Sequence, residues 1–253
     1  MDQRIGVVLS GGGHRGAAHA GMLKAMEEFN LEPDVISGSS AGAIVGAIYA
    51  AGHSPETILD IFKNIKLFSF SFYARRKAGI IDSERFEDIL KPYFTSNSFE
   101  NLQKTLLITT TNIVKGEVRV FEKGPLIPSI LASAALPGIF TPIPIEDSLY
   151  SDGGVLDNFP VSPLLGKSLD IYGSYVCPLK KLSVKDFKHS YNVIDRAVNL
   201  MMHNTSVQKF ELCKMVFSPD SLEEFGLFKT GQADRIFQIG YDHASKKLAA
   251  QKM

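Results

Sequence analysis

A serine lies between two glycines in the stretch VISGSSAG, where an apolar run ends. Gly38, Ser40 and Gly42 match the pattern glycine–x–serine–x–glycine, in which a sharp strand-to-helix turn exposes a nucleophilic hydroxyl. A helix that begins directly after Ser40 would favour the negative charge that develops during attack on a carbonyl. A plain small-residue turn explains so short a pattern equally well. Chemistry at Ser40 therefore requires a base and oxyanion donors from elsewhere in the chain.

A second glycine-rich turn lies earlier in the chain. It reads Gly11, Gly12, Gly13, His14, Arg15 and Gly16. Glycines let backbone N–H groups converge on an anion. The spacing GxGxxG also fits a dinucleotide-binding turn, which requires an acidic residue about 20 positions on, at the end of the next strand. Asp34 instead precedes its strand, so the pattern favours an oxyanion loop beside Ser40.

An aspartate followed by two glycines occurs 112 residues after Ser40, in LYSDGGVLDNFPV. A hairpin turn is the ordinary explanation of Asp152, Gly153 and Gly154. The passage ASAALPGIFTPIPI just upstream is rich in small residues and proline, and it leads the chain back toward the aspartate. A carboxylate with a pKa of about 3.9 is a weak base for an alcohol, so a basic Asp152 must be partly buried.

Two strand–turn–helix units must position these turns. The first is a strand at Ile5–Leu9 with a helix from about Gly16 to Phe29, and the second occupies residues 33–52. Successive units of this kind predict parallel strands with helices packed on them, which is an α/β fold.

The rest of the chain continues the alternation of helices and strands, without an internal repeat or a low-complexity linker. We expect helices at 55–66, 83–94 (capped by Ser83), 126–136, 191–213 and 233–250, and strands at 105–113, 117–122, 169–176 and 214–219. The 253 residues, 45% of them hydrophobic, are enough for one large domain.

Composition restricts the function classes. Lysine plus arginine equals aspartate plus glutamate at 27 each, so no global field points to nucleic acid. The two cysteines, Cys177 and Cys213, form no CxxC pair, which argues against a metal site with thiolate ligands. The apolar stretch before the first glycine loop is too short for a signal-peptide core, and residues 35–52 are too polar to span a bilayer. We therefore expect a cytoplasmic protein.

In their order along the chain, GGGHRG at 11–16, GSSAG at 38–42 and DGG at 152–154 resemble the motifs of the patatin-like phospholipases, a family of lipid acyl hydrolases. SAALPGIFTPI before the aspartate and GGVLDNFPV around it are also similar to that family. The matching segments run from about Ile5 to Val161. The resemblance implies a three-layer α/β/α sandwich with a mostly parallel central sheet, formed by one domain over residues 1–253.

The resemblance also implies roles for single residues. Ser40 corresponds to the nucleophile of a serine–aspartate dyad and Asp152 to its base. Gly11, Gly12 and Gly13 correspond to the family's oxyanion loop. The remaining motif glycines are Gly16, Gly38, Gly42, Gly153 and Gly154. Arg15 matches a basic position that helps to hold this loop, with contact to an anionic substrate as a second role. No metal or organic cofactor is implied.

The expected function is hydrolysis of fatty-acyl esters of phospholipids or lysophospholipids through an acyl-Ser40 intermediate. Three alternatives remain open: a carboxylesterase or thioesterase that acts on small acyl substrates with the same dyad, a catalytically silent lipid-binding protein, and a serine–aspartate–histidine triad. The triad requires a histidine after Asp152, and His189, His203 and His243 qualify by order. The sequence leaves the acyl position, the chain length and the oligomeric state open.

Residues 66–79, KLFSFSFYARRKAG, alternate phenylalanines with serines before a basic cluster. Such a segment can touch lipid at an interface, in transient and peripheral contact with a membrane surface. An edge strand or loop whose aromatic residues complete the core explains it as well. The hypothesis is that this segment flanks the entrance for the acyl chain.

Overall fold

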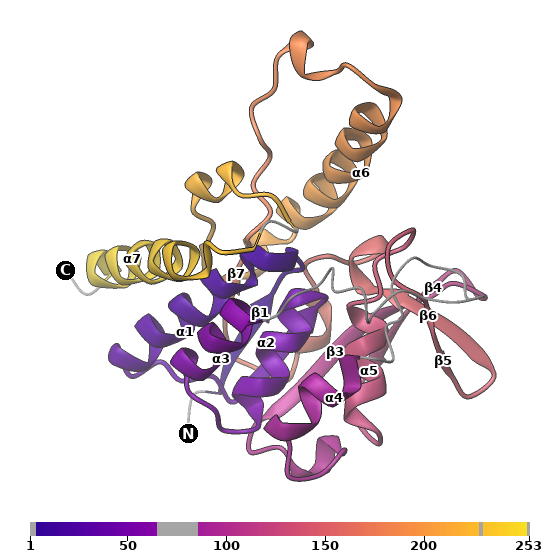
Figure 1. Cartoon of the computed structure of the whole chain (residues 1–253). Helices are drawn as coiled ribbons and strands as arrows, with labels where there is room; N and C mark the ends of the chain where they lie inside the picture. The colour runs from indigo at the N-terminus through magenta and orange to yellow at the C-terminus, as the bar shows by residue number, and fades with distance from the viewer. Residues whose placement is uncertain (1–3, 65–85, 228–229, 252–253) are drawn as a thin grey trace.

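The computed structural model of the chain describes residues 4–64, 86–227 and 230–251 (Figure 1). Within these residues an eight-stranded sheet has the order β5-β6-β3-β2-β1-β7-β8, with β4 paired to β3. The strands are β1 (Ile5–Leu9), β2 (Val35–Ser39), β3 (Thr105–Asn112), β4 (Glu117–Phe121), β5 (Ile143–Ile145), β6 (Ser148–Asp152), β7 (Asp170–Ser174) and β8 (Met215–Phe217).

The centre of the sheet is parallel, because β1 pairs in parallel with both β2 and β7, β2 with β3, and β7 with β8. Antiparallel pairs of β4 and β6 with β3, and of β5 with β6, extend the sheet at one side. Both faces of β1 and β2 are buried, which explains why their sequences are continuous apolar or small-residue runs rather than alternating ones. The predicted α/β architecture with a mostly parallel sheet is therefore confirmed.

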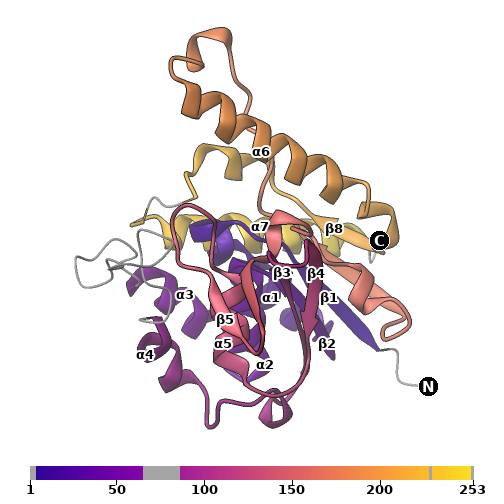
Figure 2. The same ribbon diagram turned by 90° about the vertical axis from the view of Figure 1, so that its right-hand side faces the viewer.

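A layer of five helices covers one face of the sheet (Figures 1 and 2). They are α1 (Ala17–Glu28), α2 (Ala41–Ala50), α3 (Pro55–Asn64), α5 (Leu126–Ser133) and α7 (Ala233–Gln251). Since side chains alternate along a strand, Val7 and Leu9 face this layer and Val8 faces away from it. The opposite face carries a smaller cluster in which Phe159, Leu164 and Tyr175 pack against Val8, under short 3-10 turns.

Three predicted helices end earlier than expected, among them the one predicted at 126–136, which ends at Ser133. Over the described part of residues 83–94, a one-turn helix α4 (Glu87–Leu90) gives way to a 3-10 turn that contains Pro92, because proline cannot donate to a continuing helix. Ser83, the predicted cap, lies outside the described residues. The late helix α6 runs over Ser190–Val207 and stops before Cys213. The hairpin of β5 and β6 has no counterpart among the predicted strands.

The C-terminal ends of β2 and β6 meet along one edge of β3. The strand β4 occupies one edge of β3 over residues 108–112. Both β2 and β6 must therefore pair with the other edge. There β2 ends with Ser39 opposite Thr109, and β6 ends with Asp152 opposite the next residue, Thr110. The two strands arrive from opposite directions and meet end to end.

Candidate active site

Ser40 occupies the turn between β2 and α2, and its backbone is strained, with φ 52° and ψ −121°. The turn is tight on both sides. A Cβ atom on Gly38 would lie 2.5 Å from the carbonyl oxygen of Gly42, and one on Gly42 would lie 2.2 Å from that of Leu9. Larger residues cannot fit at either position. The glycines let the helix follow the strand directly, so that Ser40 projects at the carboxyl edge of the sheet.

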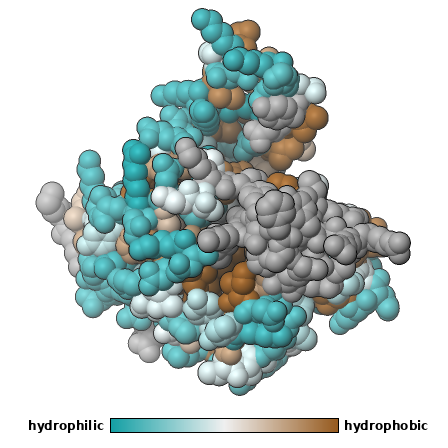
Figure 3. Space-filling view, in the orientation of Figure 1, coloured by the Kyte–Doolittle hydropathy of each residue, from teal (hydrophilic) through white to brown (hydrophobic). Residues whose placement is uncertain are grey.

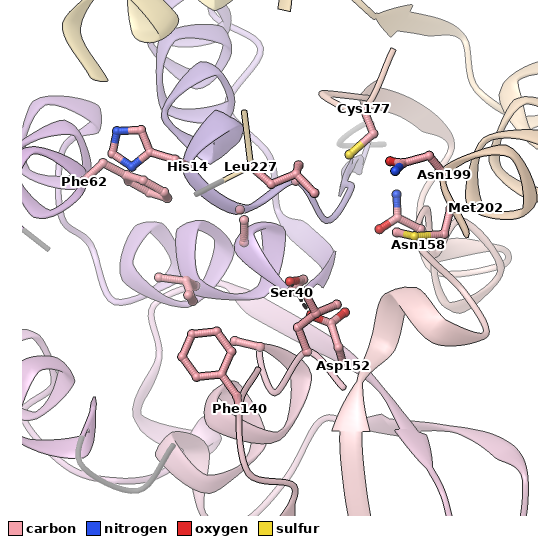
Figure 4. Close-up of a pocket in the computed structure, with 16 residues that line it drawn as sticks. His14, Ser40, Phe62, Phe140, Asp152, Asn158, Cys177, Asn199, Met202 and Leu227 are labelled. Atoms are coloured by element: carbon pink, nitrogen blue, oxygen red, sulfur yellow. Dashed lines mark hydrogen bonds between the residues drawn. The ribbon is translucent and has the colours of Figure 1, made fainter. Parts of the chain in front are cut away.

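The Ser40 hydroxyl donates a hydrogen bond of 2.6 Å to Oδ2 of Asp152 (Figure 4). The structure thus brings together the two predicted dyad residues, which lie 112 positions apart in sequence. Their contact follows from the shared edge of β3, where Ser39 and Asp152 face consecutive residues. The Ser133 hydroxyl holds the backbone of Ser40 in place. It accepts a hydrogen bond from the Ser40 N–H at 2.9 Å and donates one to the Thr109 carbonyl oxygen at 2.7 Å.

Asp152 is almost completely buried, with 3% of its surface exposed. Burial raises its pKa from an ordinary carboxyl value to about 6, while hydrogen bonds from the Ser40 hydroxyl and the Gly154 backbone N–H lower it in part. The Gly154 bond, 2.7 Å long to Oδ1, leaves Oδ2 directed at Ser40. A carboxylate held in this way is a stronger base than a solvated aspartate, and its geometry matches proton transfer from the hydroxyl.

The predicted glycine loop follows β1, directly beside Ser40, since β1 and β2 are neighbours with Leu9 opposite Gly38. The Gly11 N–H is already engaged, because it donates to the Asn158 carbonyl oxygen at 3.1 Å. The N–H groups of Gly12 and Gly13 have no hydrogen-bond partner within the described part of the chain, and both residues line the cavity above Ser40. Gly12 and Gly13, rather than Gly11, therefore have donors available for an oxyanion.

Arg15 holds this loop from behind. Its Nε donates to the Phe225 carbonyl oxygen at 2.7 Å, and its side chain is buried beneath that segment. Arg15 does not line the cavity above Ser40. Its position fits the predicted holding role, whereas contact with a substrate at Ser40 has no support in this geometry.

A mostly apolar cavity of about 120 Å³ lies over Ser40 and Asp152 (Figure 4). Its apolar walls come from helices, loops and the glycine turn, and include Ile44, Phe62, Leu136, Phe140, Met202 and Leu227. Such a lining suits a hydrocarbon chain, with the hydroxyl of Ser40 and the carboxylate of Asp152 as polar groups at its floor.

Sequence reasoning missed several polar residues of this cavity, among them Asn158 and Cys177. Asn158 is 1% exposed, and neither atom of its amide group makes a regular hydrogen bond with the described residues. The Cys177 thiol donates to the Gly11 carbonyl oxygen at 3.1 Å. Burial raises the thiol pKa, which Arg15 and the Asn158 amide partly offset. The signal for Asn158 was the sequence DGGVLDNFP itself, in which the asparagine follows the aspartate closely.

The histidines of the triad alternative lie elsewhere. His203, on α6, contacts the Tyr175 hydroxyl at 3.1 Å, and neither it, His189 nor His243 lines the cavity. Within the described ranges, no group of three or more His, Cys, Asp or Glu residues is arranged to hold a metal ion. The segment 66–79 lies outside the described residues. Within residues 4–64, 86–227 and 230–251, no helix is both long and hydrophobic enough to cross a bilayer.

Comparison with known proteins places this geometry in a family. The family model described as patatin-like phospholipase matches residues 7–165. An uncharacterized NTE family protein of Mycobacterium bovis is 33% identical over 173 residues, which cover 66% of this chain and 47% of that protein. A lysophospholipase NTE1 of Pyricularia oryzae is 27% identical over 96% of this chain, but this region is only 18% of the fungal protein. The chain thus spans less than half the length of these relatives.

Two solved structures share the fold. VipD from Legionella pneumophila superposes with a TM-score of 0.63 at 16% identity, covering 99% of this chain and 67% of that one. The type III effector protein ExoU gives a TM-score of 0.53 at 18% identity, covering 100% and 54%. The fold, the ordered motifs and the family match agree, and the chain belongs to the patatin-like phospholipase family.

Proposed function

We propose that the chain is a serine acyl hydrolase that cleaves fatty-acyl esters of phospholipids or lysophospholipids. The observation that carries the proposal is the 2.6 Å hydrogen bond from the Ser40 hydroxyl to the buried Asp152 carboxylate at the floor of an apolar cavity. Relatives named lysophospholipase support the choice of substrate class. The apolar walls favour a fatty-acyl chain over a small acyl group.

In the proposed first half-reaction, Ser40 Oγ attacks the ester carbonyl carbon while its proton passes to Asp152. The carbonyl oxygen becomes an oxyanion that accepts hydrogen bonds from the Gly12 and Gly13 N–H groups. Collapse breaks the bond between the carbonyl carbon and the alcohol oxygen. Asp152 returns its proton to the leaving alcohol, and the acyl group stays on Ser40.

In the second half-reaction, Asp152 accepts a proton from water as the water oxygen attacks the acyl-Ser40 carbonyl carbon. The same N–H groups stabilise the second oxyanion. Its collapse breaks the bond to Ser40 Oγ, which takes the proton back from Asp152. The products are a free fatty acid and the starting enzyme, so no further reactant is consumed.

The Asn158 amide is proposed to contact the substrate. A buried amide without a regular hydrogen bond is costly, and it is retained where it serves a ligand. Its oxygen lies close to both flanking loops, since a Cβ atom on Gly11 would lie 2.3 Å from it and one on Gly154 would lie 2.9 Å from it. Asn158 therefore stands between the glycine loop and the aspartate turn, where it can donate to an ester oxygen.

Intact mass after treatment with a fluorophosphonate tests the proposal, together with hydrolysis of p-nitrophenyl esters of increasing chain length. We expect the wild type to gain one label and Ser40→Ala to gain none. Both Ser40→Ala and Asp152→Asn should lose ester hydrolysis by at least about 1,000-fold. Longer acyl chains should be preferred over acetate.

Ser39→Ala is the matched control, because the Ser39 hydroxyl is buried beside Ser40 and has no partner among the described residues. This variant should label and turn over like the wild type. A wild type that neither labels nor hydrolyses any ester would leave the lipid-binding alternative. A strong preference for acetyl esters or thioesters would point to the small-substrate alternative with the same dyad.

A further inference from the structure

The helix α6 projects from the body of the protein (Figures 1 and 2). The chain leaves the sheet after β7, rises through residues 178–189, and returns along α6 to the region of the cavity. Asn199 and Met202 on this helix line the cavity above Ser40. Helix α6 therefore extends from the wall of the candidate active site to the outer surface of the protein.

The hydrophobic side of α6 faces away from the protein. In a soluble protein the apolar stripe of a surface helix normally packs on the core, and the polar side meets water. Here Ile194, Val198 and Met201 form one stripe with Ala197, and they are 64%, 47% and 70% exposed. Figure 3 shows hydrophobic side chains on the right of this upper projection, among hydrophilic ones. We call Ile194, Ala197, Val198 and Met201 the outward face of α6.

The polar side of α6 is the one turned toward the protein. Asn192, Arg196, Asn199 and His203 follow one another at helical spacing on the side opposite the outward face. The Arg196 guanidinium donates to the Lys180 carbonyl oxygen at 2.9 Å, and His203 contacts the Tyr175 hydroxyl. These contacts fix the orientation of the helix and so keep the outward face exposed.

The segment that leads into α6 is basic. Residues 180–201 contain five Lys or Arg against two Asp. Lys180, Lys181, Lys185 and Lys188 are exposed, and none of them forms a salt bridge with another described residue. Val184, on the same segment, is 90% exposed. Exposed aliphatic residues, together with a neighbouring segment of lysines that form no described salt bridge, are typical of a surface that contacts an anionic bilayer.

We propose that the outward face of α6, with the lysines before it, docks on the surface of a membrane that contains anionic lipids. Docking there would hold α6, whose Asn199 and Met202 form part of the cavity wall, against the lipid that supplies the acyl chain. This inference rests on the proposed function for its choice of a lipid partner. A protein partner fits the composition less well, because lysine is depleted in protein interfaces.

Vesicle flotation tests the proposal, with the full chain carrying Ser40→Ala so that the lipid is not consumed. The vesicles contain phosphatidylcholine alone, or phosphatidylcholine with about 30% of the anionic lipid phosphatidylglycerol. The test variant is Ile194→Gln/Val198→Gln/Met201→Gln, since glutamine keeps helix propensity. The matched control is Val114→Gln/Leu169→Gln, two residues that are 67% and 74% exposed elsewhere on the protein.

We expect anionic vesicles to float the parent and the control equally, and the α6 variant at least about 10-fold less. Lys185→Glu/Lys188→Glu should weaken binding to anionic vesicles by about 5-fold or more per lysine and leave neutral vesicles unaffected. With Ser40 restored, all variants should hydrolyse a soluble p-nitrophenyl ester within about twofold of the wild type, which separates docking from chemistry.

Equal flotation of the α6 variant and the control would overturn the proposal. So would a dimer in sedimentation that the α6 substitutions dissociate while vesicle binding is absent, since the face would then join two copies of the chain. If the wild type hydrolyses no soluble ester, the proposed function is refuted instead. Flotation of the Ser40→Ala protein still tests docking in that case, because it does not depend on catalysis.

Discussion

Ser40 and Asp152 form their 2.6 Å hydrogen bond because β2 and β6 meet end to end along one edge of β3. Ser39 faces Thr109 and Asp152 faces Thr110, so consecutive residues of one strand set the distance between nucleophile and base. A shift of β6 by one residue would turn Asp152 to the other face of the sheet. The pairing register, rather than a flexible loop, thus holds the proposed dyad together.

The buried position of Asp152 predicts how activity depends on pH. The base must be ionised, and its pKa is raised to about 6 by burial. We expect kcat/KM for a soluble p-nitrophenyl ester to be constant above about pH 7 and to fall tenfold per pH unit well below 6. The rate of Ser40 labelling by a fluorophosphonate should follow the same curve. A profile that stays flat down to pH 4.5 would contradict the role of Asp152.

Asp152→Asn is expected to stabilise the fold while it removes activity. The raised pKa means that ionisation of Asp152 costs the folded state free energy, so the contribution to stability is full below about pH 4 and is lost as the pH rises through 6. Asparagine avoids this loss. Denaturant unfolding should therefore show the variant and the wild type equal at pH 4, and the variant more stable by up to about 3 kcal/mol at pH 8. A difference that does not change with pH would contradict this account.

Gly13→Ala should damage the oxyanion loop. Gly13 has φ +55°, and a Cβ atom there would lie 2.4 Å from the Leu227 carbonyl oxygen. We expect kcat to fall by about 100-fold or more, because one donor of the loop is displaced. Gly116→Ala is the control: Gly116 also has a positive φ, of 70°, but nothing lies within 4 Å of the added atom. It should cost about 1 kcal/mol of stability and leave kcat unchanged.

Arg15→Lys separates the two predicted roles of this residue. Lysine lacks the planar fork that reaches the Phe225 carbonyl oxygen, so the free energy of unfolding should fall by about 1–3 kcal/mol. The KM for neutral and anionic substrates should change by the same factor. A rise in KM confined to anionic lipids would instead support contact with substrate. Arg235→Lys, at an exposed arginine that binds Glu224, should leave both quantities unchanged.

Asn158→Leu tests the Asn158 amide, which makes no regular hydrogen bond with the described residues. If the amide serves the substrate, its replacement by an apolar side chain of similar volume should not lower stability, but should reduce kcat/KM by about 10- to 100-fold. Ser168→Ala also removes a buried polar atom without a partner among the described residues, away from the cavity, and should leave activity intact. A destabilised Asn158→Leu protein with normal turnover per folded molecule would assign Asn158 a structural role.

The sequence predicted the features that are local. Strand β1 and the glycine turn after it, like β2 and the serine turn, are visible because apolar runs and glycines act within a few residues. Pro92 shortens the helix predicted at 83–94 over its described part, and this too was readable from the residue type. The hairpin of β5 and β6 escaped prediction because its strands are short and contain Pro144.

Long-range features could not be predicted from the sequence. The Gly11 N–H is engaged by Asn158 only because the chain returns after Asp152, so the sequence could not separate Gly11 from Gly12 and Gly13 as donors. The cavity walls come from distant segments, with Met202 on α6 and Phe140 after α5. The stripe on α6 looks like an ordinary core-facing helix until tertiary structure shows that its polar side faces the protein.

The end-to-end meeting of β2 and β6 also ties the reactive centre to the order of folding. Ser40 and Asp152 are 112 residues apart, and β3 must pair with both strands before the hydroxyl and the carboxylate come into contact. Such non-local pairings form slowly compared with helices and turns. During refolding, a pulse of fluorophosphonate would therefore label only molecules in which β2 and β6 have both paired with β3. The rate at which Ser40 becomes reactive would then report the rate at which the last of these strands pairs.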